Sequence, residues 1–246
     1  MYSYIYDSFL SEKKYISALN QVEAKITKLG LSGKICRLAP LRSLRDIVMQ
    51  EIRRNPQMIV VAGNDWIVSQ VATMVLDSNI PLGIIPVGDN NLIAAGLGID
   101  LNNAAEVLGQ RRMIKVDLGI VNRYIFLRNA KFYSNHAVVR IDNKYNINVH
   151  KSWIEIVNFL PSAEEWQSET KPSPEDGLLY LVVKEKEGGF LRKKESFQTI
   201  IPFEYISIES KEKEVILDDA TTVNSPKEVS VLKRRLRMVV GKNRNF

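Results

Sequence analysis

The chain has 246 residues, of which 45% are hydrophobic and 25% are charged. This length suffices for one large or two modest domains, and the composition excludes both a disordered chain and a small scaffold held by disulfides or metals. Lys and Arg number 34 against 28 Asp and Glu, which gives a net charge of +6. That charge permits attraction to nucleic acid, anionic lipid or phosphorylated ligands without choosing among them.

The single cysteine and the N-terminal residues indicate where the protein resides. Cys36 lies in an apolar run, where a small buried hydrophobe on a strand is the favoured interpretation, and one thiol cannot form a disulfide within the chain. The first residues lack a basic segment followed by an apolar one, and no apolar run approaches the length of a membrane span. We therefore expect a cytoplasmic protein that does not span a bilayer.

Short apolar segments alternate with amphipathic segments over the first half of the chain. The apolar segments predict strands at Tyr2–Tyr6, Lys34–Leu38, Met58–Val61 and Leu82–Pro86. The amphipathic segments predict helices at Ser11–Leu29, Leu41–Arg54 and Ile67–Leu76. The third and fourth strands are apolar almost throughout, which is typical of strands covered on both faces. This alternation predicts a mainly parallel sheet with helices on both sides.

The pattern changes after about residue 112 to short β-rich segments separated by turn residues, which is typical of antiparallel strands. These segments are Met113–Asp117, Tyr124–Leu127, Ala137–Ile141, Trp153–Phe159, Leu178–Lys184, Gln198–Ile201, Tyr205–Ile208, Glu214–Leu217 and Leu236–Val240. The acidic, proline-containing stretch Ser162–Gly177 predicts a loop open to proteolysis. We expect an α/β domain over residues 1–112 and an antiparallel, sandwich-like β domain over residues 113–246, with the last strand able to return to the first domain.

Two loops follow buried strands of the parallel sheet, the position at which such sheets bind ligands. Ala62-Gly63-Asn64-Asp65-Trp66 follows the third strand, and Val87-Gly88-Asp89-Asn90-Asn91 follows the fourth. In both places the pattern predicts a strand, then a small polar loop, then a helix. In this arrangement backbone N–H groups and the N-terminus of the helix can bind a phosphate. On residue types alone, ordinary turns with Asp65 and Asn91 as helix N-caps are the favoured interpretation.

Three segments together resemble the catalytic domain of the diacylglycerol kinase and sphingosine kinase family, which includes bacterial soluble lipid kinases. They are Met58–Trp66, Pro81–Asn91 with Gly96–Ile99, and Val116–Asn122. The resemblance implies a nucleotide-binding α/β domain similar to that of NAD kinases, a β domain, and a cleft between them where ATP meets a lipid hydroxyl. It implies ATP as phosphoryl donor, Mg²⁺ as charge neutraliser and a lipid or other small alcohol as acceptor. The implied nucleotide-binding residues are Gly63, Asn64, Asp65, Trp66, Gly88, Asp89, Asn90 and Asn91.

Both loops depart from the patterns of this family. The family carries Gly-Gly-Asp-Gly-Thr after the third strand, so Asn64 stands at the acid, Asp65 comes one position later, and Trp66 replaces the threonine. The family carries Gly-Thr-Gly-Asn-Asp after the fourth strand, which puts Asp89 where phosphate oxygens would approach. A like-charge contact at about 4 Å costs on the order of a few kcal/mol unless Mg²⁺ lies between the charges.

The second half departs from the family as well. The Gly-Phe-Asp type motif has no clear counterpart over Phe126–Ile141, and Asp218-Asp219-Ala220 lacks the glutamate of an Asp-Gly-Glu turn. Asp65 is the catalytic residue we expect if transfer survives, and Asp89, Asp218 and Asp219 are candidate metal ligands. Asp7, which follows the first strand, is a weaker candidate. Because phosphoryl transfer needs positioning, metal and an acceptor-orienting base, we expect little or no activity.

Two further features favour ordinary structural roles. His136 and His150 are the only histidines, and no cysteine or closely spaced carboxylate pair accompanies them to suggest zinc, so we expect surface or strand residues. The basic run Lys233–Val240 alternates basic and apolar residues, which predicts a final strand with a solvated basic face rather than a nucleic-acid motif.

Two functions follow from the sequence. One is an ATP-dependent lipid kinase, cytoplasmic or peripheral to the inner membrane face. The alternative is a non-catalytic protein, a pseudokinase, that uses its cleft to bind a nucleotide, a lipid or a partner. Nucleic-acid binding ranks last because it rests on charge alone. The acceptor and the oligomeric state stay open.

Overall fold

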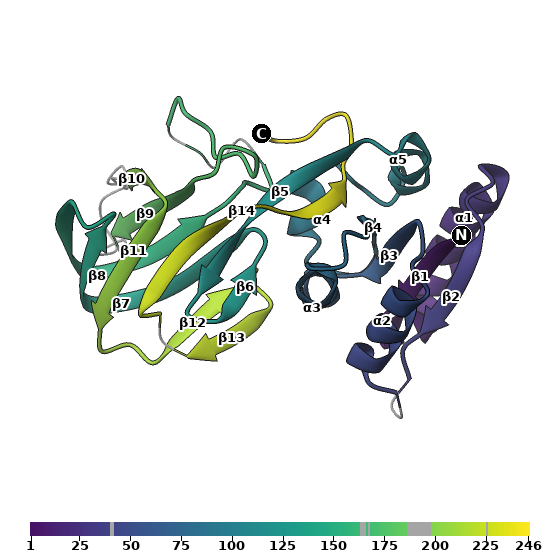
Figure 1. The fold of residues 1–246 in the computed structure, drawn as a ribbon, viewed down its shortest axis with the longest axis horizontal. Helices are drawn as coiled ribbons and strands as arrows, with labels where there is room; N and C mark the ends of the chain where they lie inside the picture. The colour runs from purple at the N-terminus through teal and green to yellow at the C-terminus, as the bar shows by residue number, and fades with distance from the viewer. Residues whose placement is uncertain (40–41, 163–165, 167, 186–197, 225) are drawn as a thin grey trace. The chain divides into compact units, whose positions relative to one another are not determined.

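The structure is a computed structural model that describes residues 1–39, 42–162, 166, 168–185, 198–224 and 226–246. The chain forms two compact units, residues 1–116 with 234–245 and residues 117–233 with 246. Figure 1 traces both units and labels their helices and strands. Two strands, β5 (Met113–Val121) and β14 (Glu228–Val239), each contribute residues to both units.

The first unit alternates strands and helices as expected. Its strands are β1 (Tyr2–Tyr6), β2 (Gly33–Arg37), β3 (Met58–Gly63) and β4 (Leu82–Pro86). Its helices are the 3-10 turn η1 (Ser8–Ser11), α1 (Lys13–Lys28), α2 (Leu44–Arg53), α3 (Asp65–Val75), α4 (Leu92–Gly96) and α5 (Ala104–Gln110). Every residue of β1, β3 and β4 is buried, which agrees with strands covered on both faces.

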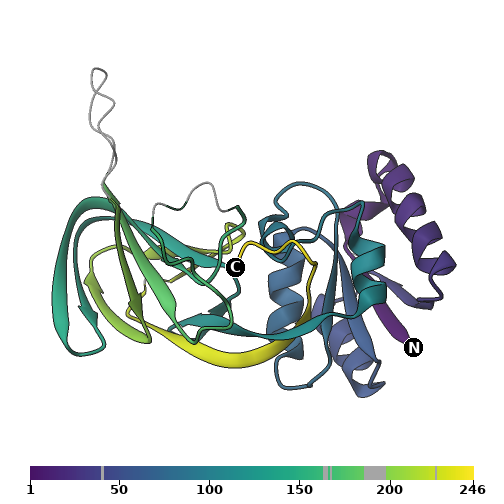
Figure 2. The ribbon, with the colours of Figure 1, turned by 90° about the horizontal axis from the view of Figure 1, so that it is seen from above.

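The strands of this unit lie in the order β14-β4-β3-β1-β2, and all of these neighbours are parallel. The chain passes from β1 to β2 on one side and then returns beyond β1 to β3 and β4. Right-handed crossovers therefore place α1 on one face and α2 and α3 on the other. The packing agrees, because α1 contacts α5 and α2 contacts α3. Figure 2 shows helices on both sides of these strands.

The second unit is built of antiparallel strands. They are β6 (Tyr124–Phe126), β7 (Asn129–Ile141), β8 (Tyr145–Val157), β9 (Leu179–Glu185), β10 (Gln198–Phe203), β11 (Tyr205–Ser210), β12 (Glu214–Leu217) and β13 (Thr221–Asn224). The main order is β10-β9-β8-β7-β11-β14, with β12 pairing both β7 and β13. Buried side chains such as those of Phe132, Val139 and Ile154 form its hydrophobic core. The antiparallel pairing supports the expected change from a parallel to an antiparallel arrangement.

The two central strands of this unit are longer than the sequence indicates. The pattern predicts strands at Ala137–Ile141 and Trp153–Phe159, whereas β7 begins at Asn129 and β8 begins at Tyr145. Their additional residues include exposed polar side chains such as Asn148 and His150, which interrupt an apolar run although the backbone continues to pair. Similarly, β14 begins at Glu228, eight positions before the predicted Leu236.

Other expectations hold with small changes. Leu236, Met238 and Val240 are buried while Lys233, Arg235 and Arg237 are exposed, as alternation predicts. Cys36 lies on β2 and is half-buried, and burial together with the nearby charge of Glu51 raises the pKa of its thiol. Parts of the predicted acidic loop, residues 163–165 and 167, lie outside the described residues. In the described part of the chain, no helix combines the length and the apolar character needed to cross a membrane.

Candidate functional site

The carboxyl edge of the parallel sheet brings together the loops that follow β1, β3 and β4. The N–H of Asp7 donates to the carbonyl of Ala62 (3.0 Å), and the N–H of Val87 donates to the carbonyl of Gly63 (3.1 Å). The direction of the strand order reverses between β1 and β3, and open α/β sheets bind ligands at such a switch point. We call residues 7–9, 63–66 and 87–91 the switch-point edge.

Gly63 is required by packing within this edge. Its φ of +153° is unfavourable for residues that carry a side chain. A Cβ at this position would also lie 2.6 Å from Cγ2 of Ile67 and 3.2 Å from Cβ of Asp7. The glycine therefore allows the loop after β3 to pass directly against the loop after β1.

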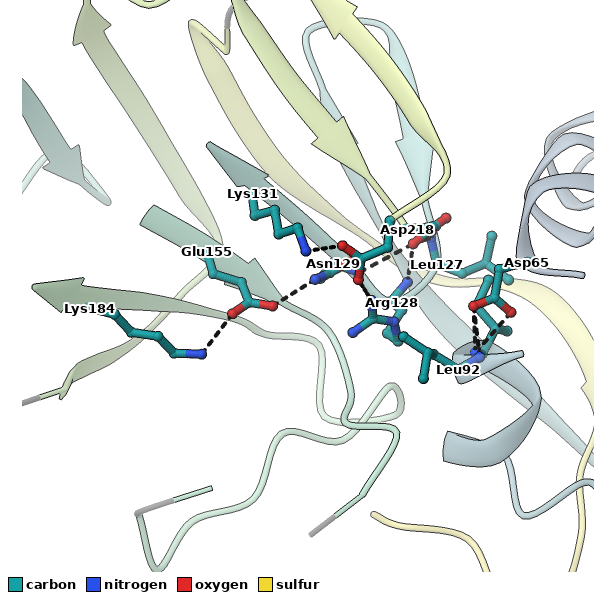
Figure 3. A network of polar contacts seen from close by, with 11 residues as sticks. Asp65, Leu92, Leu127, Arg128, Asn129, Lys131, Glu155, Lys184 and Asp218 are labelled. Atoms are coloured by element: carbon teal, nitrogen blue, oxygen red, sulfur yellow. Dashed lines mark hydrogen bonds and ion pairs between the residues drawn. The ribbon is translucent and has the colours of Figure 1, made fainter. Parts of the chain in front are cut away.

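Asp65, the expected catalytic residue, is buried at the first turn of α3, with 1% of its surface exposed. Its Oδ2 accepts from the N–H of Leu92 at 2.8 Å, and the N–H of Ile93 lies 3.1 and 3.2 Å from its two carboxylate oxygens (Figure 3). Its own N–H donates to the carbonyl of Asn90 (2.8 Å). Asp65 thus joins the loop after β3 to the first turn of α4. The N–H groups that could donate to a phosphate therefore already donate to the carboxylate of Asp65.

The neighbours of Asp65 face different surroundings. Asn64 is the N-cap residue of α3, but its side chain makes no capping hydrogen bond. Its Oδ1 is buried and finds no hydrogen-bond partner among the described residues, an arrangement that costs about 1–3 kcal/mol when no donor is supplied. Trp66 is 43% exposed. This part of the edge therefore presents an unsatisfied acceptor on Asn64 and, two positions later, an indole that is partly open to solvent.

The loop after β4 supplies the remaining predicted residues. Gly88 has φ +86°, and a Cβ there would lie 3.0 Å from the ring of Phe9. The side-chain amide of Asn91 donates to the carbonyl of Gly88 (2.6 Å), which fixes the turn. Asp89 and Asn90 are exposed, and no ion pair to Asp89 is present among the described residues. The charge of Asp89 therefore adds to the negative potential of the edge.

Asp7 occupies a more central position than its sequence context indicates. It is 6% exposed, and the hydroxyl of Ser8 donates to its Oδ1 (3.2 Å). It lies against Gly63, at the point where β1 and β3 end. Two observations identify Asp7. Its place directly after the first buried strand is visible in the sequence, whereas the strand order, which puts β1 beside β3, is visible only in the structure.

Asp218, a candidate metal ligand, belongs to the second unit and is 1% exposed. Its carboxylate accepts from three consecutive backbone N–H groups, those of Leu127 (3.0 and 3.1 Å), Arg128 (2.7 Å) and Asn129 (3.2 Å). Figure 3 shows this carboxylate directed at the backbone of the segment before β7. These contacts give Asp218 a structural role, because the buried N–H groups of this segment would lack an acceptor without its carboxylate.

Asp219 forms ion pairs with Arg128 and Lys131. Burial alone would raise the pKa of its carboxyl, but the hydrogen bond from Lys131 and the two positive charges outweigh burial, so that the pKa lies below its usual value. The same network extends to Glu155, which accepts from the amide of Asn129 (2.6 Å) and pairs with Lys184 (3.1 Å). These acids are neutralised by cations of their own unit.

The residues do not fit the Mg²⁺ ion that the resemblance implies. Mg²⁺ requires oxygen ligands in near-octahedral geometry. Asp65 and Asp218 receive backbone N–H donors, and Asp219 receives two cations. No group of three or more His, Cys, Asp or Glu side chains suited to a metal ion occurs among the described residues. Asp65, Asp218 and Asp219 therefore do not form a magnesium site within the part of either unit that the structure describes.

Comparison with known proteins supports the family expected from the sequence. Residues 4–121 match the family described as diacylglycerol kinase catalytic domain. The expected resemblance to diacylglycerol kinases is confirmed. A diacylglycerol kinase from Bacillus anthracis str. Sterne has a TM-score of 0.78 at 17% identity, over 98% of this chain and 97% of that one. An NAD kinase from Archaeoglobus fulgidus in complex with ATP has a TM-score of 0.60 at 12% identity, over 100% of this chain and 96% of that one.

No protein with a curated function matches the chain in sequence. At 17% identity and below, the solved structures establish the diacylglycerol kinase-like and NAD kinase-like fold. They leave the chemistry to be argued from the residues of this chain, because one fold supports many functions.

Proposed function

We propose that this diacylglycerol kinase-like protein binds a ligand at the switch-point edge without transferring a phosphoryl group. The observation that carries the proposal is the contact of Asp65 with the N–H groups of Leu92 and Ile93. A carboxylate and a phosphate are both acceptors, so they compete for the same donors at a helix N-terminus. Here the chain's own acid holds those donors, and a nucleotide phosphate would have to displace it.

The other polar groups of the edge support the same conclusion. Asp7, Asn64 Oδ1 and Asp89 are acceptors, and two of them carry negative charge. A phosphate would meet repulsion at these groups, whereas a ligand that brings N–H or O–H donors would satisfy them. We therefore infer a ligand rich in hydrogen-bond donors, such as a nucleoside or a polyol.

A second candidate is the ATP-dependent lipid kinase implied by the family. The ATP complex of the Archaeoglobus NAD kinase, which shares the fold, favours it. In that function ATP donates the phosphoryl group to a lipid hydroxyl or a similar alcohol, and Asp65 acts in catalysis. Asp65 would then have to leave the N–H groups of α4, at the cost of leaving buried donors without acceptors.

Ligand binding separates the two candidates. ATP, ADP and adenosine are titrated into the protein with and without Mg²⁺, and the thermal shift and heat of binding are measured. A ligand at 100 times its Kd adds about 2.7 kcal/mol of stability, which such assays detect. We expect the phosphates to add no affinity, so that adenosine binds at least as tightly as ATP. Much tighter binding of Mg-ATP would favour the kinase, and no response to any of the three would favour a ligand other than a nucleoside.

Activity is tested with radiolabelled ATP on a panel that contains diacylglycerol and sphingosine. We expect no phosphoryl transfer above the rate without protein, because each 1.36 kcal/mol lost from transition-state stabilisation slows the reaction about tenfold. The matched variants are Asp65→Asn and Asp89→Asn. Robust turnover that Asp65→Asn abolishes and Asp89→Asn retains would establish Asp65 as catalytic and overturn the proposal.

A further inference from the structure

The register of the second unit brings the two histidines of the chain together. His136 on β7 and His150 on β8 are direct cross-strand partners, and both are exposed. Their Nδ1 atoms lie 3.3 Å apart, and their ring centroids lie 4.8 Å apart. A hydrogen bond between these two atoms requires that one Nδ1 carries hydrogen and donates, while the other accepts with its lone pair.

This separation matches the spacing of two ligands on one metal ion. Imidazole nitrogens bind Zn²⁺ at about 2.0–2.1 Å, so two of them at a tetrahedral angle lie about 3.3–3.4 Å apart. Coordination requires only that the hydrogen on Nδ1 of one ring moves to Nε2 of the same ring. Each Nδ1 then offers a lone pair, and the two nitrogens are close enough to bind one ion.

We propose that His136 and His150 form a binding site for a divalent transition-metal ion, with Zn²⁺ as the ion that suits the geometry. The chain supplies two ligands, and water completes the coordination shell, which leaves the ion exchangeable and open to a third ligand. The site lies in the second unit and is independent of the function proposed for the switch-point edge.

The neighbouring backbone and charges shape this site. Pairing of β7 with β8 is interrupted between Ser134↔Ser152 and His136↔His150, where Lys151 has φ +45°. The N–H of Asn135, next to His136, donates to Oε1 of Glu212 (3.1 Å). The carboxylate of Glu212 therefore contacts the backbone next to His136, and Lys151 follows His150 in sequence.

The test uses the full chain without a histidine tag, because a tag would compete for the metal. Zn²⁺ is titrated calorimetrically, and the imidazole nitrogens are followed by ¹⁵N NMR, which reports the tautomer of each ring. The variants are His136→Asn, His150→Asn and the double variant. The controls are Asn148→Ala, which alters an exposed neighbour on β8, and Cys36→Ser, which removes the single thiol. Circular dichroism verifies that each variant is folded.

We expect one Zn²⁺ per chain and conversion of both rings to the Nε2–H tautomer. Each histidine variant weakens binding by at least the roughly tenfold that loss of a supporting group costs a metal site, and the double variant abolishes it. The two control variants bind as the wild type does. Unchanged binding by a folded double variant, or nitrogen signals in the wild type that do not respond to Zn²⁺, would overturn the proposal.

Discussion

The carboxylate of Asp65 accepts a hydrogen bond from the backbone N–H of Ile93, a residue 28 positions further along the chain. The contact holds the first turn of α4 against the start of α3, and it is buried. Two loops that a nucleotide-binding kinase would use for phosphates are thereby tied together by an acid of the protein. The relationship has consequences for stability as well as for binding.

Asp65→Ala is expected to lower the free energy of unfolding by about 1–3 kcal/mol, because the part-buried N–H of Leu92 and the buried N–H of Ile93 lose their acceptor. Urea unfolding measures the effect. Asp89→Ala is the matched control, since Asp89 is exposed on the adjoining loop and its loss is expected to change stability by less than about 0.5 kcal/mol. Equal effects of the two substitutions would show that the Asp65 contact is not what stabilises the loops.

Gly63→Ala is expected to destabilise the protein by about 1–3 kcal/mol, because the added methyl group overlaps Ile67 and the backbone stays at an unfavourable φ. Gly109→Ala provides the comparison. Gly109 lies in α5, where a Cβ would meet only ordinary contacts at 3.6 Å, and alanine favours a helix by up to about 1 kcal/mol. Thermal unfolding is expected to move in opposite directions for the two variants. A stabilised Gly63→Ala protein would contradict the packing described for the switch-point edge.

The ion pairs of Asp219 predict a dependence of stability on pH. Its pKa in the folded protein is lowered, so the carboxylate stabilises the fold above its unfolded pKa of about 3.9. This contribution is lost as the pH falls through the folded pKa. Between pH 5 and about pH 2.5, the wild type should lose stability more steeply than Asp219→Asn in urea unfolding. Lys131→Met should reduce the difference, whereas parallel profiles for wild type and Asp219→Asn would refute the assignment.

Asp89→Thr is expected to strengthen the binding of nucleotides with phosphates, because it removes a negative charge and restores the residue of the family pattern. Adding Asn64→Asp and Trp66→Thr moves the first loop toward its family pattern. Calorimetry compares ATP with adenosine for each variant, and only the affinity for ATP should rise after Asp89→Thr. If the wild type binds Mg-ATP tightly and these substitutions weaken it, the two loops form a different but working nucleotide site.

The sequence was sufficient to predict β1 to β4, because buried parallel strands such as Met58–Gly63 form continuous apolar runs, and it predicted α1, α2 and α3. The short helix α5 was not predicted. It also indicated the two loops of the switch-point edge and the resemblance to diacylglycerol kinases. Long antiparallel strands were harder to predict. The exposed faces of β7 and β8 carry polar residues, so their ends could not be located from apolar residues alone.

Contacts between distant residues could not be derived from the sequence. Asp65 was expected to act in catalysis or to cap its own helix, and only the fold reveals that it caps α4. The two histidines were interpreted as surface or strand residues, and their pairing was not foreseen because it depends on the register of β7 with β8. The two histidines are 14 positions apart, and the segment between them forms a hairpin whose turn at residues 142–144 determines that register.

The pairing of β14 with β4 has a consequence for synthesis of the protein. Met238 pairs with Leu82, and residues 234–245 belong to the same unit as the N-terminal strands. A nascent chain that has released β1 to β4 from the ribosome therefore lacks the strand that covers one side of β4. Until residues 234–245 emerge, β4 presents open backbone donors and acceptors to other chains. Protection by a chaperone during this interval would keep the first unit from associating with unfinished copies of itself.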